Sequence, residues 1–133
     1  MTSNLSWMLN EKILLLEYEG QIDSPLIDSS YAEISDMLGQ VPQKQAYLLV
    51  DISNSDKGGN IKDYEYLLLS QLDTSQVKAV IVISKSLEPL KPLTQRIERE
   101  RSKRSLPQIL FGTDREIAFN YLAQIVDKQA VYS

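Results

Sequence analysis

The sequence has 133 residues, of which 43% are hydrophobic and 24% are charged. This is the size and balance of one ordinary globular domain, and we expect residues 1–133 to form a single unit. Histidine and cysteine are both absent. Their absence excludes Ser-His-Asp and Cys-His nucleophile systems, disulfides, and zinc or iron–sulfur sites built on these side chains. The remaining carboxylates and lysines single out no catalytic centre, so we expect no cofactor and no enzymatic activity.

The N-terminal segment does not combine a basic region with an apolar stretch, so it does not look like a secretory signal. The longest apolar runs are also far shorter than the ~18 residues that span a bilayer. We therefore expect a cytoplasmic protein without a membrane span.

Charge is distributed unevenly along a chain whose net charge is −4. Residues 1–74 carry 4 basic and 12 acidic side chains, whereas residues 75–133 carry 10 basic and 6 acidic ones. Such asymmetry can mark an anionic partner or pairing between copies, although most charge runs simply face solvent. The net acidity disfavours nucleic-acid binding. The densest basic patch consists of Arg96, Arg99, Arg101, Lys103 and Arg104.

The first third of the chain predicts a hairpin followed by a helix. Apolar runs at 5–9 and 12–18 flank a polar pair, which predicts two antiparallel strands, the second ending at Gly20. Residues 23–25 (Asp-Ser-Pro) predict a helix start, because a polar cap followed by proline suits the first helical turn. Gly39 predicts the end of that helix.

The middle of the chain predicts two buried strands separated by a polar loop and a helix. Residues 45–52 are nearly all apolar, which is typical of a central strand buried on both faces, and Asp51 lies at its C-terminal end. The polar, glycine-containing loop 53–60 follows, and helical spacing of apolar residues predicts a helix over 61–72. Residues 77–83 are mostly β-branched and predict the second buried strand.

The last third predicts a helix over 90–104, a short strand over 107–111 and a final helix. The apolar residues of helix 90–104 lie in its first half, so its second half should project into solvent. Thr113 and Glu116 match a capping box at the start of the final helix. The residues expected to form the buried stripe of the final helix are Ile117, Tyr121, Leu122, Ile125 and Val126.

The resulting order, β-β-α-β-α-β-α-β-α, predicts an α/β fold. We expect a mixed, mostly parallel five-stranded sheet with an N-terminal antiparallel hairpin and about four helices.

Four stretches of the sequence, in this order and spacing, carry a family resemblance. Trp7 precedes a strand through Tyr18, residues 49–53 (Leu-Val-Asp-Ile-Ser) end the central strand, residues 79–82 (Ala-Val-Ile-Val) form a later strand, and residues 109–122 close the domain. This arrangement resembles the STAS domains, the sulfate-transporter and anti-sigma-factor-antagonist group, in their SpoIIAA-like branch. The resemblance implies that fold and a role in regulation or protein interaction, with the loop after the central strand facing the partner.

In that family the loop carries an Asp-Ser-Ser-Gly element whose serine is phosphorylated by a partner kinase, and the added charge breaks the interface. Here residues 56–58 read Asp-Lys-Gly, and Ser53 and Ser55 lie earlier in the loop. The resemblance therefore implies an interaction module without the usual phosphoserine switch. The residues expected at its interaction loop are Asp51, Ser53, Ser55, Asp56, Gly58, Gly59 and Asn60.

Two other interpretations of this loop remain open. Asp51, Asp56 and Asn60 offer oxygen ligands for Mg²⁺ or Ca²⁺, but their spacing departs from a calcium loop, and we favour Asp51 as an acceptor of backbone N–H bonds at a strand end. Gly58 and Gly59 precede a helix and could cradle a phosphate, although the surrounding residues match no known phosphate loop.

Two functions follow from these features. The one we favour is a non-enzymatic regulatory or protein-interaction module of STAS-like type, which binds a protein partner or a second copy of itself. The alternative is a small-molecule or lipid-binding protein, in which helix 90–104 is a lid whose arginines meet an anionic head group.

Overall fold

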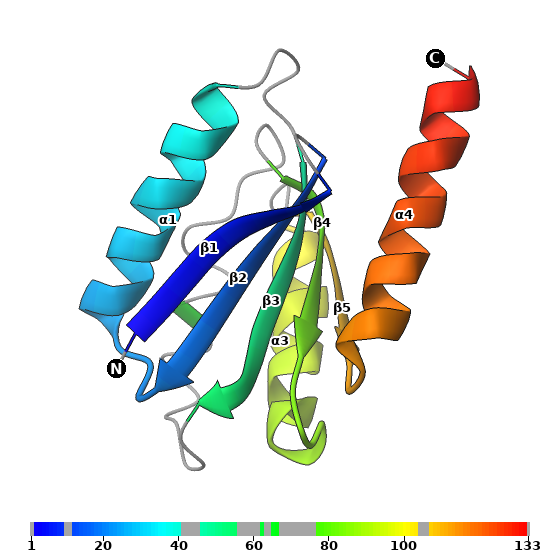
Figure 1. Ribbon diagram of the computed structural model, residues 1–133. Helices are drawn as coiled ribbons and strands as arrows, with labels where there is room; N and C mark the ends of the chain where they lie inside the picture. Colours follow the sequence, from blue (N-terminus) through cyan, green and yellow to red (C-terminus); the bar gives the residue numbers. More distant parts are fainter. Residues whose placement is uncertain are drawn as a thin grey trace.

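The computed structural model describes residues 2–9, 12–40, 46–55, 62, 65–66, 77–103 and 107–132. A five-stranded sheet with its strands in sequential order forms the centre of the fold (Figure 1). The first two strands pair antiparallel and every later neighbour pairs parallel, so the expected sheet is confirmed. The strands are β1 (Thr2–Leu9), β2 (Ile13–Gly20), β3 (Ala46–Ser55), β4 (Val77–Ile83) and β5 (Gln108–Gly112).

The described residues contain three α-helices, where about four were expected. They are α1 (Ser24–Gly39), α3 (Lys91–Arg101) and α4 (Arg115–Tyr132), and a short 3₁₀ helix, η2 (Glu88–Leu90), leads into α3. The helix predicted over 61–72 lies almost entirely outside the described residues. None of the described helices is both long enough and apolar enough to cross a bilayer.

The chain topology explains why the two faces of the sheet are covered unequally. Each parallel strand is added on the same side of the previous one, and right-handed crossovers then place the connecting helices on one face. Accordingly, among the described helices, α1 and α3 cover one face, whereas α4, which follows the last strand, covers the other (Figure 1).

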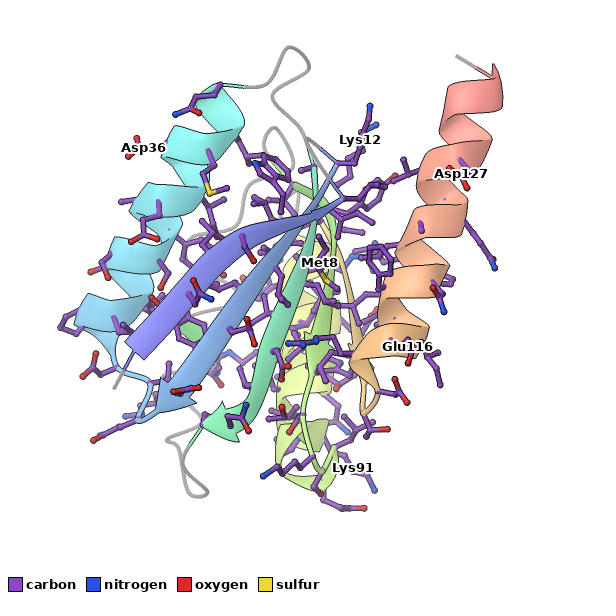
Figure 2. All side chains as sticks on the ribbon, viewed as in Figure 1. Met8, Lys12, Asp36, Lys91, Glu116 and Asp127 are labelled. Carbon is purple, nitrogen blue, oxygen red and sulfur yellow. The ribbon has the colours of Figure 1, made fainter. Side chains whose placement is uncertain are left out.

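Helix α1 begins where the sequence predicts. The Asp23 carboxylate accepts a hydrogen bond from the backbone N–H of Leu26 at 3.0 Å, and Pro25 occupies the first turn, where its missing N–H leaves no donor unpaired. The strand before it ends at Gly20, whose φ of 76° lies in the left-handed region that glycine tolerates. The acidic side chains of α1 face solvent, as Asp36 does in Figure 2.

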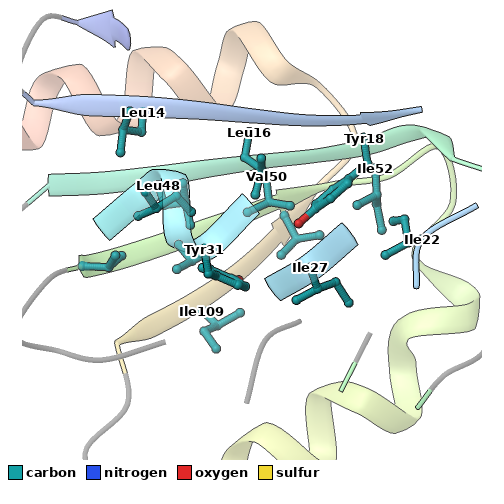
Figure 3. Packing of buried hydrophobic residues seen from close by; sticks show 14 of the residues in the cluster. Leu14, Leu16, Tyr18, Ile22, Ile27, Tyr31, Leu48, Val50, Ile52 and Ile109 are labelled. Atoms are coloured by element: carbon teal, nitrogen blue, oxygen red, sulfur yellow. The ribbon is translucent and has the colours of Figure 1, made fainter. Parts of the chain in front are cut away.

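The core under α1 and α3 contains a buried polar contact. The Tyr18 hydroxyl donates to Ser30 Oγ at 2.9 Å, and the Ser30 hydroxyl donates to the carbonyl of Leu26 at 2.5 Å (Figure 3 shows Tyr18 among its apolar neighbours). Burial raises the pKa of Tyr18 to about 12, and burial likewise raises the pKa of Tyr31 well above its usual value. This contact fixes the position of α1 on β2.

The face covered by α4 corrects one expectation about that helix. Ala118, Leu122 and Val126 are buried against the sheet, but Ile117 and Tyr121 remain 69% and 46% exposed. Successive residues turn by about 100° around a helix, so the apolar arc of α4 is wider than one sheet face can cover. The prediction that Ile117 and Tyr121 belong to the buried stripe was therefore wrong.

The start of α4 corrects a second expectation. The cap is Asp114, whose Oδ1 accepts hydrogen bonds from the backbone N–H groups of Glu116 at 2.9 Å and Ile117 at 3.1 Å. Thr113 was predicted in this role, but the helix begins one residue later, at Arg115, which moves the cap by one position.

Helix α3 binds the sheet through its first half, as predicted. Leu93 and Ile97 are almost completely buried, and Leu90 precedes them from η2. The other side chains of the helix are exposed, apart from Glu100, which is half-buried. Lys91, at the start of the helix, points away from the sheet in Figure 2. The helix ends at Arg101, three residues earlier than expected.

Candidate interaction site

The strand predicted over 45–52 is the central strand of the sheet. It forms most of β3, which pairs with β2 on one side and β4 on the other and is buried along seven consecutive residues. Asp51 lies near the C-terminal end of this strand with 7% of its surface exposed. Its register neighbours are Glu17 on β2 and Ile83 on β4. A buried carboxylate therefore stands beside a second carboxylate at the rim of the sheet where the parallel strands end.

Arg115 lies between these two carboxylates. Its Nη1 donates to Glu17 Oε2 at 2.9 Å and to Asp51 Oδ2 at 3.3 Å. Like charges opposite one another on neighbouring strands repel, and the guanidinium offsets that repulsion. Because Arg115 is the first residue of α4, this contact also ties the start of α4 to the central strands. We call Glu17, Asp51 and Arg115 the rim cluster.

The second oxygen of Asp51 organises the beginning of the loop. Asp51 Oδ1 accepts hydrogen bonds from the Ser53 backbone N–H at 2.9 Å and from the Ser53 hydroxyl at 2.5 Å. Asp51 thus accepts a backbone N–H bond at a strand end, as expected. The Ser55 hydroxyl donates to the carbonyl of Ile52 at 2.6 Å. Both serine hydroxyls at the rim are therefore held in local hydrogen bonds.

The remaining residues of the expected interaction loop cannot be placed on this rim. Asp56, Gly58, Gly59 and Asn60 lie outside the described residues, so the phosphate-cradle interpretation remains a prediction. Across the described part of the chain, no group of three or more carboxylates is arranged to hold a metal ion.

Glu17 and Arg115 were not among the site residues predicted from the sequence. They are 98 positions apart, and Arg115 lies 64 positions from Asp51. The register between β2 and β3 places Glu17 beside Asp51, and the residues of either strand alone do not predict that register. For Arg115 the sequence offered one weak signal. The final helix was predicted to start directly after the last strand, which places Arg115 at the same end of the sheet as Asp51.

The basic patch expected on helix 90–104 divides into two sides. Arg96 and Arg99 are three residues apart and share one side of α3, and Lys103 lies in the turn that follows the helix. Together with Glu100 they line a hollow of about 200 Å³, and Arg96 also approaches Glu65, with Nε 3.8 Å from Oε2. Arg101 is exposed elsewhere on the helix, and Arg104 lies outside the described residues.

A comparison with solved structures gives a clear fold assignment. The structure is similar to the crystal structure of an uncharacterized protein of the DUF3478 family with a SpoIIAA-like fold from Shewanella loihica PV-4, with a TM-score of 0.58. The match covers 91% of this chain and 92% of that one. The chain has a SpoIIAA-like fold. At 15% sequence identity the similarity concerns the fold, which is the one that the sequence resemblance implies.

The sequence itself matches no family model and no curated protein. What this SpoIIAA-like domain binds must therefore be argued from its own side chains.

Proposed function

We propose that this SpoIIAA-like domain is a non-enzymatic interaction module that presents the rim around β3 to a protein partner. The observation that carries the proposal is the rim cluster together with Ser53 and Ser55, whose charged and hydroxyl groups are held by hydrogen bonds. Asp51 is bound by Ser53 and by Arg115, and Ser55 donates to the backbone. Groups held in this way form a rigid polar surface suited to recognition.

The same contacts disfavour chemistry at the rim. A nucleophilic hydroxyl needs a base that takes its proton and an open path to substrate. Ser53 donates to a carboxylate that Arg115 already neutralises in part, and Asp51 itself is 7% exposed. In our proposal, recognition here does not use the phosphoserine of the Asp-Ser-Ser-Gly element, whose place in the sequence is taken by Asp-Lys-Gly.

The proposal can be tested by affinity capture from an extract of the source organism, quantified by mass spectrometry. Asn54 is exposed on β3, three residues after Asp51 at the end of the strand, so Asn54→Arg should abolish capture of a partner without unfolding the domain. Gln124→Arg introduces the same charge at an exposed position of α4 and should retain the partner. If no protein is captured by both the wild type and Gln124→Arg and lost with Asn54→Arg, the rim is not the binding surface.

A second candidate function is binding of a small anionic ligand at α3, supported by the hollow that Arg96, Arg99 and Lys103 share. Arginine forks suit carboxylate and phosphate groups, and the buried residues Leu93 and Ile97 would become accessible to an acyl chain if α3 moved. Native mass spectrometry of freshly purified protein tests this. Co-purified lipid or metabolite that is lost in Arg99→Gln supports the function, and an unliganded mass for both proteins contradicts it.

A further inference from the structure

An apolar hollow lies between β5 and the first turns of α4. It has a volume of about 290 Å³, and its lining includes Ile81, Leu110, Ile117 and Tyr121. Ile117 and Tyr121 are large hydrophobic side chains that remain exposed on α4. Single exposed apolar side chains are common in soluble proteins, but apolar side chains that converge on a concave surface are the usual setting of a small-molecule site.

The position of α4 explains why the hollow stays open. Although α4 follows β5 in the chain, it packs on β3, which lies two strands away in the sheet. The helix therefore covers β5 incompletely, and Leu110 on this face of β5 is only half-buried. The hollow also reaches the carboxyl end of β5, where Gly112 and Thr113 contribute to its lining. Open α/β sheets bind ligands at the carboxyl ends of their parallel strands.

The polar end of the hollow is acidic. Thr113 and Asp114 line it there, and both are exposed. Asp114 Oδ1 accepts the two hydrogen bonds that cap α4, whereas its Oδ2 has no hydrogen-bond partner among the described residues. Within the described chain no basic side chain lines the hollow, and the neighbouring Arg115 contacts Glu17 and Asp51 on β2 and β3 instead. This end therefore favours a cationic hydrogen-bond donor and disfavours an anion.

We propose that this hollow binds a small aromatic amine. The ring packs on Leu110 and stacks beside Tyr121, and the ammonium group donates to Asp114 and Thr113. The volume of the hollow lies near the lower end of the ~300–1,000 Å³ that is typical of ligand sites, which suits one or two fused rings rather than a long acyl chain. This inference does not depend on the proposed function of the rim.

Titration of the ¹⁵N-labelled protein, followed by NMR, tests the proposal with probes that share an indole ring and a two-carbon chain. The chain ends in an ammonium group in tryptamine, a hydroxyl in tryptophol and a carboxylate in indole-3-propionate. Tryptamine should shift the amide signals of residues 112–117 saturably and bind at least about 10-fold more tightly than indole-3-propionate, with tryptophol between them. Equal affinity for all probes, tighter binding of indole-3-propionate, or no saturable shift at millimolar tryptamine would overturn the proposal.

A matched pair of charge variants tests the polar end of the site. Asp114→Asn removes the charge but keeps α4 capped, because asparagine caps helices about as well as aspartate. It should weaken tryptamine binding by about 3-fold or more and leave tryptophol binding unchanged. Glu116→Gln removes the same charge from an exposed residue that does not line the hollow and should bind tryptamine like the wild type. Equal losses in the two variants would show general attraction to an acidic surface and refute the site.

A second pair of variants tests the apolar wall. Tyr121→Ala should weaken tryptamine and tryptophol binding alike by about 5-fold or more, and Tyr121→Phe should restore both, because the ring of Tyr121 supplies the stacking surface. Tyr121 is 46% exposed, so neither variant should change the circular dichroism spectrum. Asn120→Ala alters an exposed neighbour on α4 that does not line the hollow and should bind both probes like the wild type. Unchanged affinity in Tyr121→Ala would contradict the proposed site.

Discussion

Replacing Arg115 tests whether the rim cluster is a structural clamp. Arg115→Met keeps most of the aliphatic stem but leaves Asp51 and Glu17 side by side with no cation between them. The side chain of Asp51 is 9% exposed, whereas those of Glu17 and Arg115 are 32% and 42% exposed. Losing one partner of a fully buried pair costs about 3–5 kcal/mol, and losing an exposed pair costs about 0–1 kcal/mol. Because this cluster is partly open to solvent, we expect a loss of about 1–2 kcal/mol.

Urea unfolding at pH 7 measures this loss, and a double-mutant cycle assigns it. In an Asp51→Asn background the same Arg115→Met change should cost less than about 0.5 kcal/mol, since the surviving contact to Glu17 is a surface ion pair. Lys91→Met serves as a control, because Lys91 pairs with Glu88 at 2.9 Å where both side chains are more than two thirds exposed. Equal losses for Arg115→Met and Lys91→Met, or the same cost in both backgrounds, would refute the clamp.

Three further outcomes follow from the fold. Burial raises the pKa of folded Tyr18 to about 12, whereas a tyrosine in the unfolded chain has a pKa near 10, so the unfolded state loses its proton first. The contribution of Tyr18 to stability is therefore complete below pH 10 and falls by up to about 3 kcal/mol towards pH 12. Urea midpoints between pH 9 and 11.5 should therefore decline less in Tyr18→Phe, and an equal decline would count against this origin. Leu93→Ala should lower the free energy of unfolding by about 2–5 kcal/mol, whereas exposed Gln95→Ala should change it by less than about 0.5 kcal/mol, which chemical denaturation can measure. Asp23→Ala should cost about 1 kcal/mol by removing the α1 cap, and Asp23→Asn should restore most of it in the same assay.

The sequence was sufficient to predict the elements whose signals are local. A cap at Asp23, an unbroken apolar run in β3 and a thin apolar face on α3 each fix one element through its own residues. The mixed, mostly parallel sheet with its antiparallel hairpin followed because right-handed crossovers between parallel strands leave few alternatives. The fold class was therefore predictable without knowing any contact between distant residues.

The rim cluster was not predictable in the same way, because it depends on strand register. A shift of one residue between β2 and β3 would turn Glu17 to the opposite face and separate it from Asp51. Helix spacing likewise showed that α4 has apolar residues but not which of them the sheet covers. The orientation of α4 depends on where Asp114 and Arg115 hold its start, and this required the structure.

The buried Asp51 illustrates how one residue can link two parts of a surface. Its Oδ1 accepts both hydrogen bonds from Ser53 and so holds the start of the loop, while its Oδ2 contacts Arg115 and so holds the start of α4. A partner at the rim can reach Ser53 more readily than Asp51, since Ser53 is only partly buried. If the rim binds a partner as we propose, Asp51 would act on recognition through the residues it positions, Ser53 and Arg115. The same carboxylate contacts the first residue of α4 and so ties the start of that helix to the central strand of the sheet.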